Sequence, residues 1–131
     1  KVDTKDKSGK TAIFVAAQFG HSDTVRCLAR LKADVKVRAM QDASAVYIAS
    51  QEGHVSVVKA LAELKADVNT PQSNGTTPLY IASEKGHVNV VKALGKLKAN
   101  VNTPKNDDAT PLFVASQQGH VAVVKALGQL K

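Results

Sequence analysis

The chain has 131 residues, of which 44% are hydrophobic and 22% charged, a composition typical of a folded globular protein. No run approaches the roughly 20 apolar residues of a membrane-spanning helix, and no signal-peptide pattern is present, so we expect no membrane insertion. The single cysteine, Cys27, excludes an internal disulfide and agrees with a cytoplasmic or other reducing intracellular compartment.

A period of 33 residues organises the chain. It is marked by Gly20-His21, Gly53-His54, Gly86-His87 and Gly119-His120. A period of this length indicates copies of one supersecondary unit. We therefore predict a single domain over residues 1–131, built from units 2–34, 35–67, 68–100 and 101–131.

The unit 68–100 shows the expected elements in order. A turn segment comes first, and its Asn74-Gly75 dipeptide favours a tight hairpin. Thr77-Pro78 then begins a first helix, with the threonine as N-cap, and Gly86 ends it. A second helix follows, with its apolar stripe at helical spacing. That stripe consists of Val88, Val91, Leu94 and Leu97.

The other units repeat these signals. Thr11, Ser44 and Thr110 are the equivalent caps. Neither helix is long enough, at about 10 residues, to be stable alone. Stability is therefore expected to come from stacking like faces in a solenoid.

The repeated motif resembles the ankyrin repeat. The resemblance rests on Thr77-Pro78-Leu79, on Ala82, on Gly86-His87 and Val90-Val91, and on Asp67-Val68-Asn69. It covers essentially the whole chain and recurs four times. It implies an all-α fold, with stacked helix-turn-helix units joined by β-hairpin-like loops around a concave binding face.

Four departures from the family pattern recur. Phenylalanine or tyrosine replaces the histidine that follows Thr-Pro-Leu in the family, which adds packing area in place of a hydrogen bond. These residues are Phe14, Tyr47, Tyr80 and Phe113. The glycine that ends the second helix is a lysine, and a positive φ there costs about 1 kcal/mol, so we expect a rearranged helix end. These lysines are Lys32, Lys65, Lys98 and Lys131. One leucine of the usual pair is replaced by a small residue, namely Ala29, Ala62, Gly95 and Gly128. We expect the space to be filled by Leu31, Leu64, Leu97 and Leu130. The turn glycine is replaced in two units by Asp42 and Asp108, since aspartate tolerates a left-handed conformation.

The four histidines raise the question of a metal or catalytic site. Stacked units lie about 10 Å apart, too far for one metal with ligand bonds of about 2 Å. We expect each histidine to be buried or half-buried and to form a hydrogen bond near the start of the second helix. No glycine-rich phosphate loop or nucleophile elbow is present, so we expect neither an enzyme nor a bound metal or cofactor. Cys27 aligns with Ala60, Ala93 and Ala126 and is expected to be a small buried filler.

The net charge is +7, and basic residues recur at the same positions of the second helices. A solvated basic stripe is the leading interpretation, and binding to an acidic protein or an anionic lipid surface stays an alternative. Its members are Arg26, Lys59, Lys92 and Lys125, with Lys32, Lys65, Lys98 and Lys131. Nucleic-acid binding is not expected, because aromatic residues and arginines are not interleaved with the charge.

Differences between the units indicate where a partner binds. Units 68–100 and 101–131 differ at 11 of 31 matched positions, five in the turn and two at the end of the first helix. The family architecture implies that both segments line the concave face, so we predict that they bind a partner; neutral drift is the alternative.

The predicted contact residues are taken unit by unit. The first unit contributes Lys7, Ser8, Lys10, Gln18 and Phe19. The second contributes Arg38, Met40, Gln41, Ala43, Gln51 and Glu52. The third contributes Ser73, Asn74, Thr76, Glu84 and Lys85. The fourth contributes Asn106, Asp107, Ala109, Gln117 and Gln118.

Within this set, Phe19 and Met40 are predicted to form adjacent hot spots, with packing of Phe19 on an N-terminal cap as the alternative. Lys5, Lys7, Lys10 and Arg38 make this end basic and suggest an acidic patch on the partner.

The sequence thus predicts a protein–protein interaction module. The alternative is a structural spacer, or a regulatory segment of a longer ankyrin array or multidomain protein. The last unit keeps the apolar residues of the internal ones, so its end is expected to be uncapped and to self-associate. These residues are Val121, Val124, Leu127 and Leu130.

Overall fold

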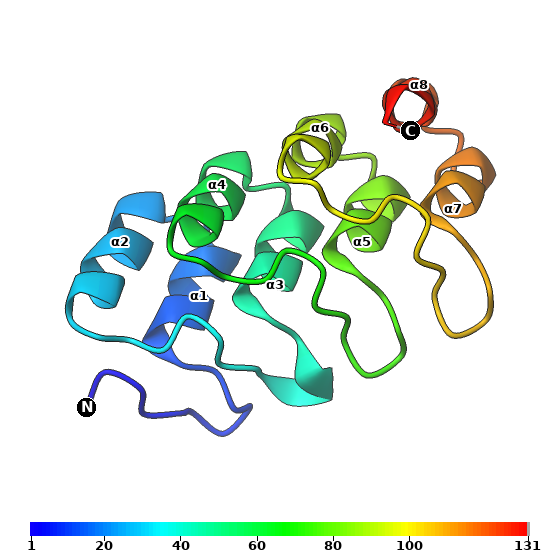
Figure 1. Cartoon of the computed structure of the whole chain (residues 1–131). Helices are drawn as coiled ribbons and strands as arrows, with labels where there is room; N and C mark the ends of the chain where they lie inside the picture. Colours follow the sequence, from blue (N-terminus) through cyan, green and yellow to red (C-terminus); the bar gives the residue numbers. More distant parts are fainter. Residues whose placement is uncertain (131) are drawn as a thin grey trace.

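The computed structural model describes residues 1–130, which form an all-α stack of helix pairs (Figure 1). The helices are α1 (Ala12–Gln18), α2 (Ser22–Arg30), α3 (Ala45–Glu52), α4 (Val55–Glu63), α5 (Pro78–Lys85), α6 (Val88–Lys96), α7 (Pro111–Gln117) and α8 (Val121–Gln129). A short 3₁₀ turn, η1 (Met40–Asp42), precedes α3. In Figure 1 the odd-numbered helices form an inner row, the even-numbered helices form an outer row above it, and the connecting loops project below.

The predicted N-caps begin three of the four inner helices. The hydroxyls of Ser44, Thr77 and Thr110 accept hydrogen bonds from the backbone N–H three residues later, at 3.0, 3.1 and 3.2 Å. Thr11 is an exception, because its buried hydroxyl has no hydrogen-bond partner. The prediction of a side-chain cap at Thr11 is therefore wrong.

The lysines that end the outer helices adopt the left-handed conformation. Their φ values are 71° at Lys32, 69° at Lys65 and 65° at Lys98, whereas Lys131 lies outside the described residues. The expected rearrangement does not occur. At the end of α2, Lys32 N–H donates to the Ala29 carbonyl at 2.9 Å and Ala33 N–H to the Leu28 carbonyl at 3.0 Å, a standard helix ending that offsets the backbone cost.

The core lies between the two rows of helices and between successive units. Inner helices pack on inner helices, for example α3 on α5, and outer helices pack on outer ones, for example α4 on α6. The fully buried side chains are mainly aliphatic, as the scarcity of aromatic residues predicted. The aromatic residues Phe14, Tyr47 and Tyr80 are also buried and supply packing area, whereas Phe113 is 59% exposed, so the predicted packing role is not confirmed for it.

Leucines at the end of the outer helices reach back to the preceding unit. A Cβ added to Gly95 would collide with the side chain of Leu130, so Leu130 occupies the space that this glycine leaves open. Leu64 and Leu97 are half-buried in the same position, whereas Leu31 meets no preceding unit within residues 1–130 and is exposed. The prediction that these leucines fill the space left by small residues is therefore confirmed for Leu130, and the space that it fills lies in the preceding unit.

The two ends of the stack differ from the interior. Cys27 is exposed, although the aligned Ala60 is fully buried, because this position faces the preceding unit and residues 1–130 contain none before the first. The prediction of a buried Cys27 is wrong. At the other end Val121 is exposed, whereas Leu127 is buried.

Candidate interaction surface

Four loops and the ends of the inner helices make up the surface that the sequence singled out. We call the loops 5–10, 38–43, 71–76 and 104–109 loops 1 to 4. In loop 3, Gln72 N–H donates to the Thr76 carbonyl at 3.0 Å and Gly75 N–H to the Gln72 carbonyl at 2.9 Å. The same two bonds close the other three loops, so each tip has a fixed hairpin-like shape without extended strands in residues 1–130.

Backbone bonds also link neighbouring loop tips. Ser73 N–H donates to the Gln41 carbonyl at 2.8 Å, and Asn106 N–H donates to the Asn74 carbonyl at 3.2 Å. Loops 2, 3 and 4 are therefore tied together as a row. No equivalent bond from Met40 N–H to loop 1 exists in the part of the chain that the structure describes.

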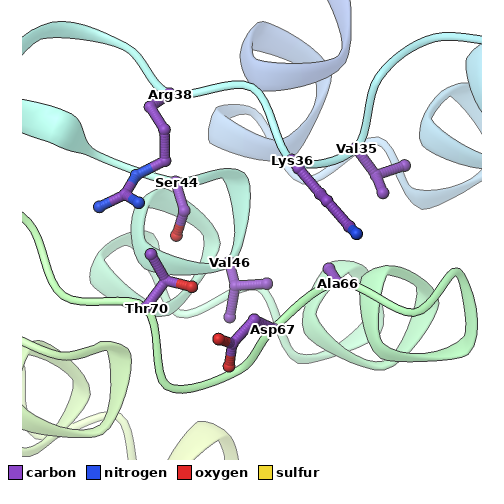
Figure 2. Close-up of a pocket in the computed structure, with 8 residues that line it drawn as sticks. All are labelled: Val35, Lys36, Arg38, Ser44, Val46, Ala66, Asp67 and Thr70. Carbon is purple, nitrogen blue, oxygen red and sulfur yellow. The ribbon is translucent and has the colours of Figure 1, made fainter.

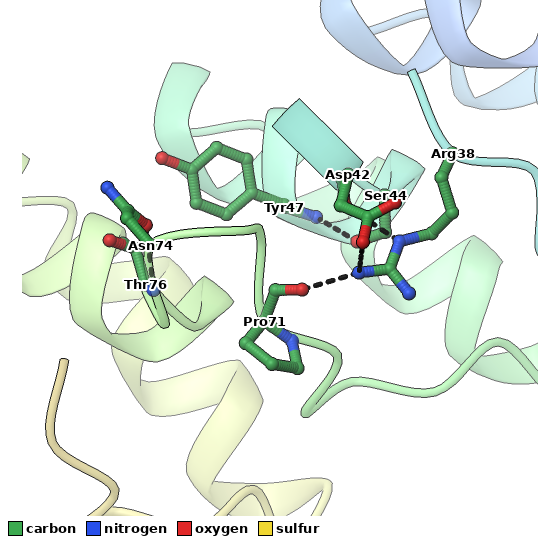
Figure 3. A network of polar contacts seen from close by, with 7 residues as sticks. All are labelled: Arg38, Asp42, Ser44, Tyr47, Pro71, Asn74 and Thr76. Carbon is green, nitrogen blue, oxygen red and sulfur yellow. Dashed lines mark hydrogen bonds and ion pairs between the residues drawn. The ribbon is translucent and has the colours of Figure 1, made fainter. Parts of the chain in front are cut away.

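Arg38 reinforces the link between loops 2 and 3 (Figure 3). Its guanidinium donates from Nε to the Asp42 carbonyl at 2.7 Å and from Nη2 to the Pro71 carbonyl. The Asp42 carboxylate lies 3.8 Å from Nη2. Since two of its donor groups are used within the loops, Arg38 positions the surface, and its prediction as a contact residue is not supported by this geometry.

Three histidines fix the ends of the inner helices. The Nε2 atoms of His54, His87 and His120 form hydrogen bonds with carbonyls of the preceding unit at 3.0, 2.9 and 2.9 Å. Their partners are the carbonyls of Gln18, Gln51 and Glu84, all three in the predicted contact set. The expected structural role is confirmed for these three residues, with the bond reaching between units. It is wrong for His21, which is exposed and whose ring forms no hydrogen bond within residues 1–130. Among residues 1–130, no group of three or more His, Cys, Asp or Glu side chains could hold a metal ion.

Most predicted contact residues have accessible side chains. The exposed ones are Lys7, Phe19, Met40, Gln41, Glu52, Ser73, Asn74, Lys85, Asn106, Asp107, Gln117 and Gln118. The half-buried ones are Ser8, Lys10, Gln18, Gln51, Glu84 and Ala109. Thr76 and Ala43 are buried, with only 3% of Thr76 exposed, so the structure contradicts their assignment as contacts. Both sit where loops join the inner helices.

The two apolar members of the set are exposed but not adjacent. Phe19 is 63% exposed and follows the C-terminal end of α1, whereas Met40 is 65% exposed and lies in the loop before α3. The inner helices lie side by side with the loops at one end (Figure 1). Seven residues of helix span about 10 Å, so the two side chains mark opposite edges of the surface. The prediction of one adjacent pair is wrong, and Phe19 does not pack down as an N-terminal cap.

Between loop 4 and α5 lies a polar cluster that includes Tyr80, a residue that the sequence assigned only to packing. Lys105 Nζ lies 5.7 Å from the ring centre of Tyr80 and 3.5 Å from the Asp107 carboxylate. Burial, and secondarily the charge of Glu84, raises the pKa of Tyr47 to about 12. Burial also raises the pKa of Tyr80. The signal in the sequence was the substitution of an aromatic residue for the family histidine.

Charge differs between the ends of the surface. At loop 1, Lys7 is exposed and Lys10 Nζ donates to Gln18 Oε1 at 3.3 Å. At loop 4, Asp107 and Asp108 are exposed, and a hydrogen bond from Ala109 N–H lowers the pKa of Asp107. The surface is thus basic at the first unit and carries acidic groups at the last.

A separate hollow of about 290 Å³ lies between the start of unit 35–67 and the loop after α4 (Figure 2). Its lining includes Lys36, Val46, Asp67 and Thr70. Arg38 is its only member from the predicted contact set, so the hollow is distinct from the interaction surface.

The repeated helix pairs, the hairpin-like loops and the bonds that link each unit to the next define a repeat protein of the solenoid class. A family model described as "Ankyrin repeats (3 copies)" matches residues 1–72 and 64–130. The chain therefore belongs to the ankyrin repeat family, whose members generally act as protein–protein interaction modules and are typically non-enzymatic. A comparison with curated proteins gave no match. In residues 1–130, no helix combines the length and hydropathy required to cross a bilayer.

Proposed function

We propose that this chain binds a protein partner through the loop tips and the exposed ends of the inner helices. The observation that carries the proposal is the exposure of Phe19 and Met40 on this surface. Equivalent positions in the other units hold polar residues, namely Glu52, Lys85 and Gln118 for Phe19, and Lys7, Ser73 and Asn106 for Met40. Large exposed apolar side chains that break a polar pattern are typical anchors of a protein interface.

Preorganisation supports the same proposal. The histidine bonds hold the main chain at Gln18, Gln51 and Glu84, and the bonds between loops 2, 3 and 4 hold the tips. A partner therefore meets side chains on a backbone that is already ordered, which reduces the entropy lost on binding. The basic end at Lys7 and Lys10 favours a partner with an acidic patch next to an apolar one.

Affinity capture with matched variants tests the proposal. The Phe19→Ala/Met40→Ala double variant is compared with the wild type and with Lys59→Ala/Lys92→Ala, a control on the exposed outer row. We expect at least one captured protein to be retained by the wild type and the control but reduced about tenfold or more by the double variant, the loss of a hot spot.

Far-UV circular dichroism must be the same for all three proteins, because Phe19 and Met40 contribute little to the core. The single variants then show which edge of the surface binds. Equal capture of every protein by the wild type and the Phe19→Ala/Met40→Ala variant would refute this assignment of the surface.

A further inference from the structure

A hydrogen bond that closes the first and third units is missing in the second. In the first unit the Asp34 N–H donates to Asp3 Oδ1 at 2.9 Å. In the third unit the Asn100 N–H donates to Asn69 Oδ1, also at 2.9 Å. Each bond joins the second residue of a unit to its last one. The equivalent donor in the second unit is the Asp67 N–H, which forms no hydrogen bond within residues 1–130.

The missing acceptor is explained by Lys36, which occupies the position of Asp3 and Asn69. An ammonium group donates hydrogen bonds but cannot accept one, so Lys36 cannot take over the role of the side-chain oxygen. Its Nζ also has no carboxylate partner within residues 1–130. An unused N–H donor and an unpaired cation therefore occur together in the second unit.

The hollow of about 290 Å³ lies at this place, and Lys36 and Asp67 both line it. Figure 2 shows Lys36 extending across the hollow towards Ala66. Val35, Val46 and Ala66 give the hollow an apolar wall. At about 30 Å³ for a water-sized group, it has room for about ten non-hydrogen atoms. The hollow thus suits a small group with an apolar part and an oxygen acceptor.

The other charged groups of the hollow are already engaged. The Arg38 guanidinium lies 3.8 Å from the Asp42 carboxylate and donates to two backbone carbonyls of the loops. The Asp67 carboxylate accepts a hydrogen bond from the Asn69 N–H at 2.8 Å. Lys36 is therefore the cation that a bound anion would meet.

The first unit shows that a carboxylate fits beside the aspartate of this position. There the Asp3 carboxylate bonds the N–H of Asp34, the residue equivalent to Asp67. That arrangement places two carboxylates close together without a lysine at the position of Lys36. A carboxylate at the Asp67 N–H would have the Lys36 charge in addition, which favours its binding.

We propose that the hollow binds a carboxylate group of a ligand. Its oxygens accept a hydrogen bond from the Asp67 N–H and pair with Lys36 Nζ, so the ligand supplies the acceptor that the chain itself supplies in the first and third units. The Ser44 and Thr70 hydroxyls also line the hollow and are placed to bond further polar atoms of the ligand. A small organic acid and an acidic side chain of a partner protein are the two sources of such a group.

A titration followed by the ¹H–¹⁵N NMR signal of the Asp67 amide tests the proposal and separates these sources. The probes are hexanoate and the peptide acetyl-Gly-Glu-Gly-amide, compared at equal ionic strength with hexanamide and the matching glutamine peptide. We expect a saturable downfield shift with a charged probe and about tenfold weaker binding of its neutral counterpart. Binding of hexanoate indicates a free acid, and binding of the glutamate peptide alone indicates a protein side chain.

Two variants of one residue separate charge from hydrogen bonding. Lys36→Met keeps the length of the side chain but removes its charge, so the dissociation constant should rise about tenfold. Lys36→Asn restores the oxygen that Asn69 provides in the third unit. It should bond the Asp67 N–H, abolish binding and raise the urea midpoint. The control Lys96→Asn removes the same charge from an exposed position on α6 and must bind like the wild type.

The absence of a saturable shift at Asp67 with both charged probes would overturn the proposal. Equal binding of the neutral probes would do so too, as would unchanged binding by Lys36→Asn. The hollow shares only Arg38 with the predicted contact set, and no variant in this test alters Phe19 or Met40. This test and that of the proposed function therefore fail independently.

Discussion

Two glycines with the same backbone conformation allow the packing between units to be measured. Gly86 has a φ of +79° and Gly119 a φ of +74°. An alanine at either position bears a similar backbone cost of about 1 kcal/mol. Their surroundings differ, because a Cβ at Gly86 would lie 2.8 Å from both Cε1 and Nδ1 of His120, whereas a Cβ at Gly119 meets nothing within 4 Å.

The magnitude follows from what the imidazole must give up. To make room for the methyl group of Gly86→Ala, the His120 ring has to move and lose its 2.9 Å hydrogen bond to the Glu84 carbonyl. That loss adds about 1–2 kcal/mol, so Gly86→Ala should cost about 2–3 kcal/mol and Gly119→Ala about 1 kcal/mol.

Urea unfolding followed by far-UV circular dichroism measures both losses. Gly119 lies in the last unit, which can unfold separately, so Gly53→Ala serves as a second internal case; its Cβ would lie 2.9 Å from His87 Nδ1. It should behave like Gly86→Ala. In a His120→Ala background, the added cost of Gly86→Ala should fall to that of Gly119→Ala. Equal losses at Gly86 and Gly119, or an unchanged cost in that background, would refute the reasoning.

Other substitutions test the remaining local features. Lys98→Gly should raise the free energy of unfolding by up to about 1 kcal/mol in urea titrations, because Lys98 has a φ of 65°, whereas Lys92→Gly inside the helix should lower it by about 1 kcal/mol. Thr77→Val should cost about 1 kcal/mol through the lost cap, and a similar cost for Thr11→Val would contradict the absence of a cap bond there. Burial raises the pKa of Tyr47 from 10.0 to about 12, so its contribution to stability is complete below pH 10.0 and is lost as the pH rises towards 12. Urea midpoints at about pH 9 and 11 should fall less in Tyr47→Phe than in the wild type, and equal falls would exclude this contribution.

The sequence predicted the features that depend on local chain chemistry and on nearest neighbours. Ser44, Thr77 and Thr110 cap their helices, and the glycine of each Gly-His pair takes a positive φ, because these preferences act over a few residues. The aliphatic core follows for the same reason, since every internal unit meets a neighbour of the same kind.

The errors occur where equal position in the repeat does not mean equal surroundings. Cys27 aligns with buried alanines but lies at an end of the stack, so its environment differs. Arg38 bonds the Pro71 carbonyl of the next loop, a contact that no pattern within one unit can indicate. The lysines at positive φ bear a backbone cost that the sequence reveals, but the two hydrogen bonds that complete each helix end offset it and appear only in the structure.

The direction of the contacts between units links the interaction surface to the end of the stack. Each internal histidine reaches back, so the main chain at Gln18, Gln51 and Glu84 is held by the unit that follows. Gln117 occupies the same place in the last unit and has no following histidine within residues 1–130. A partner that contacts this surface therefore meets three positions whose main chain is already held by the following unit, which reduces the entropy lost on binding.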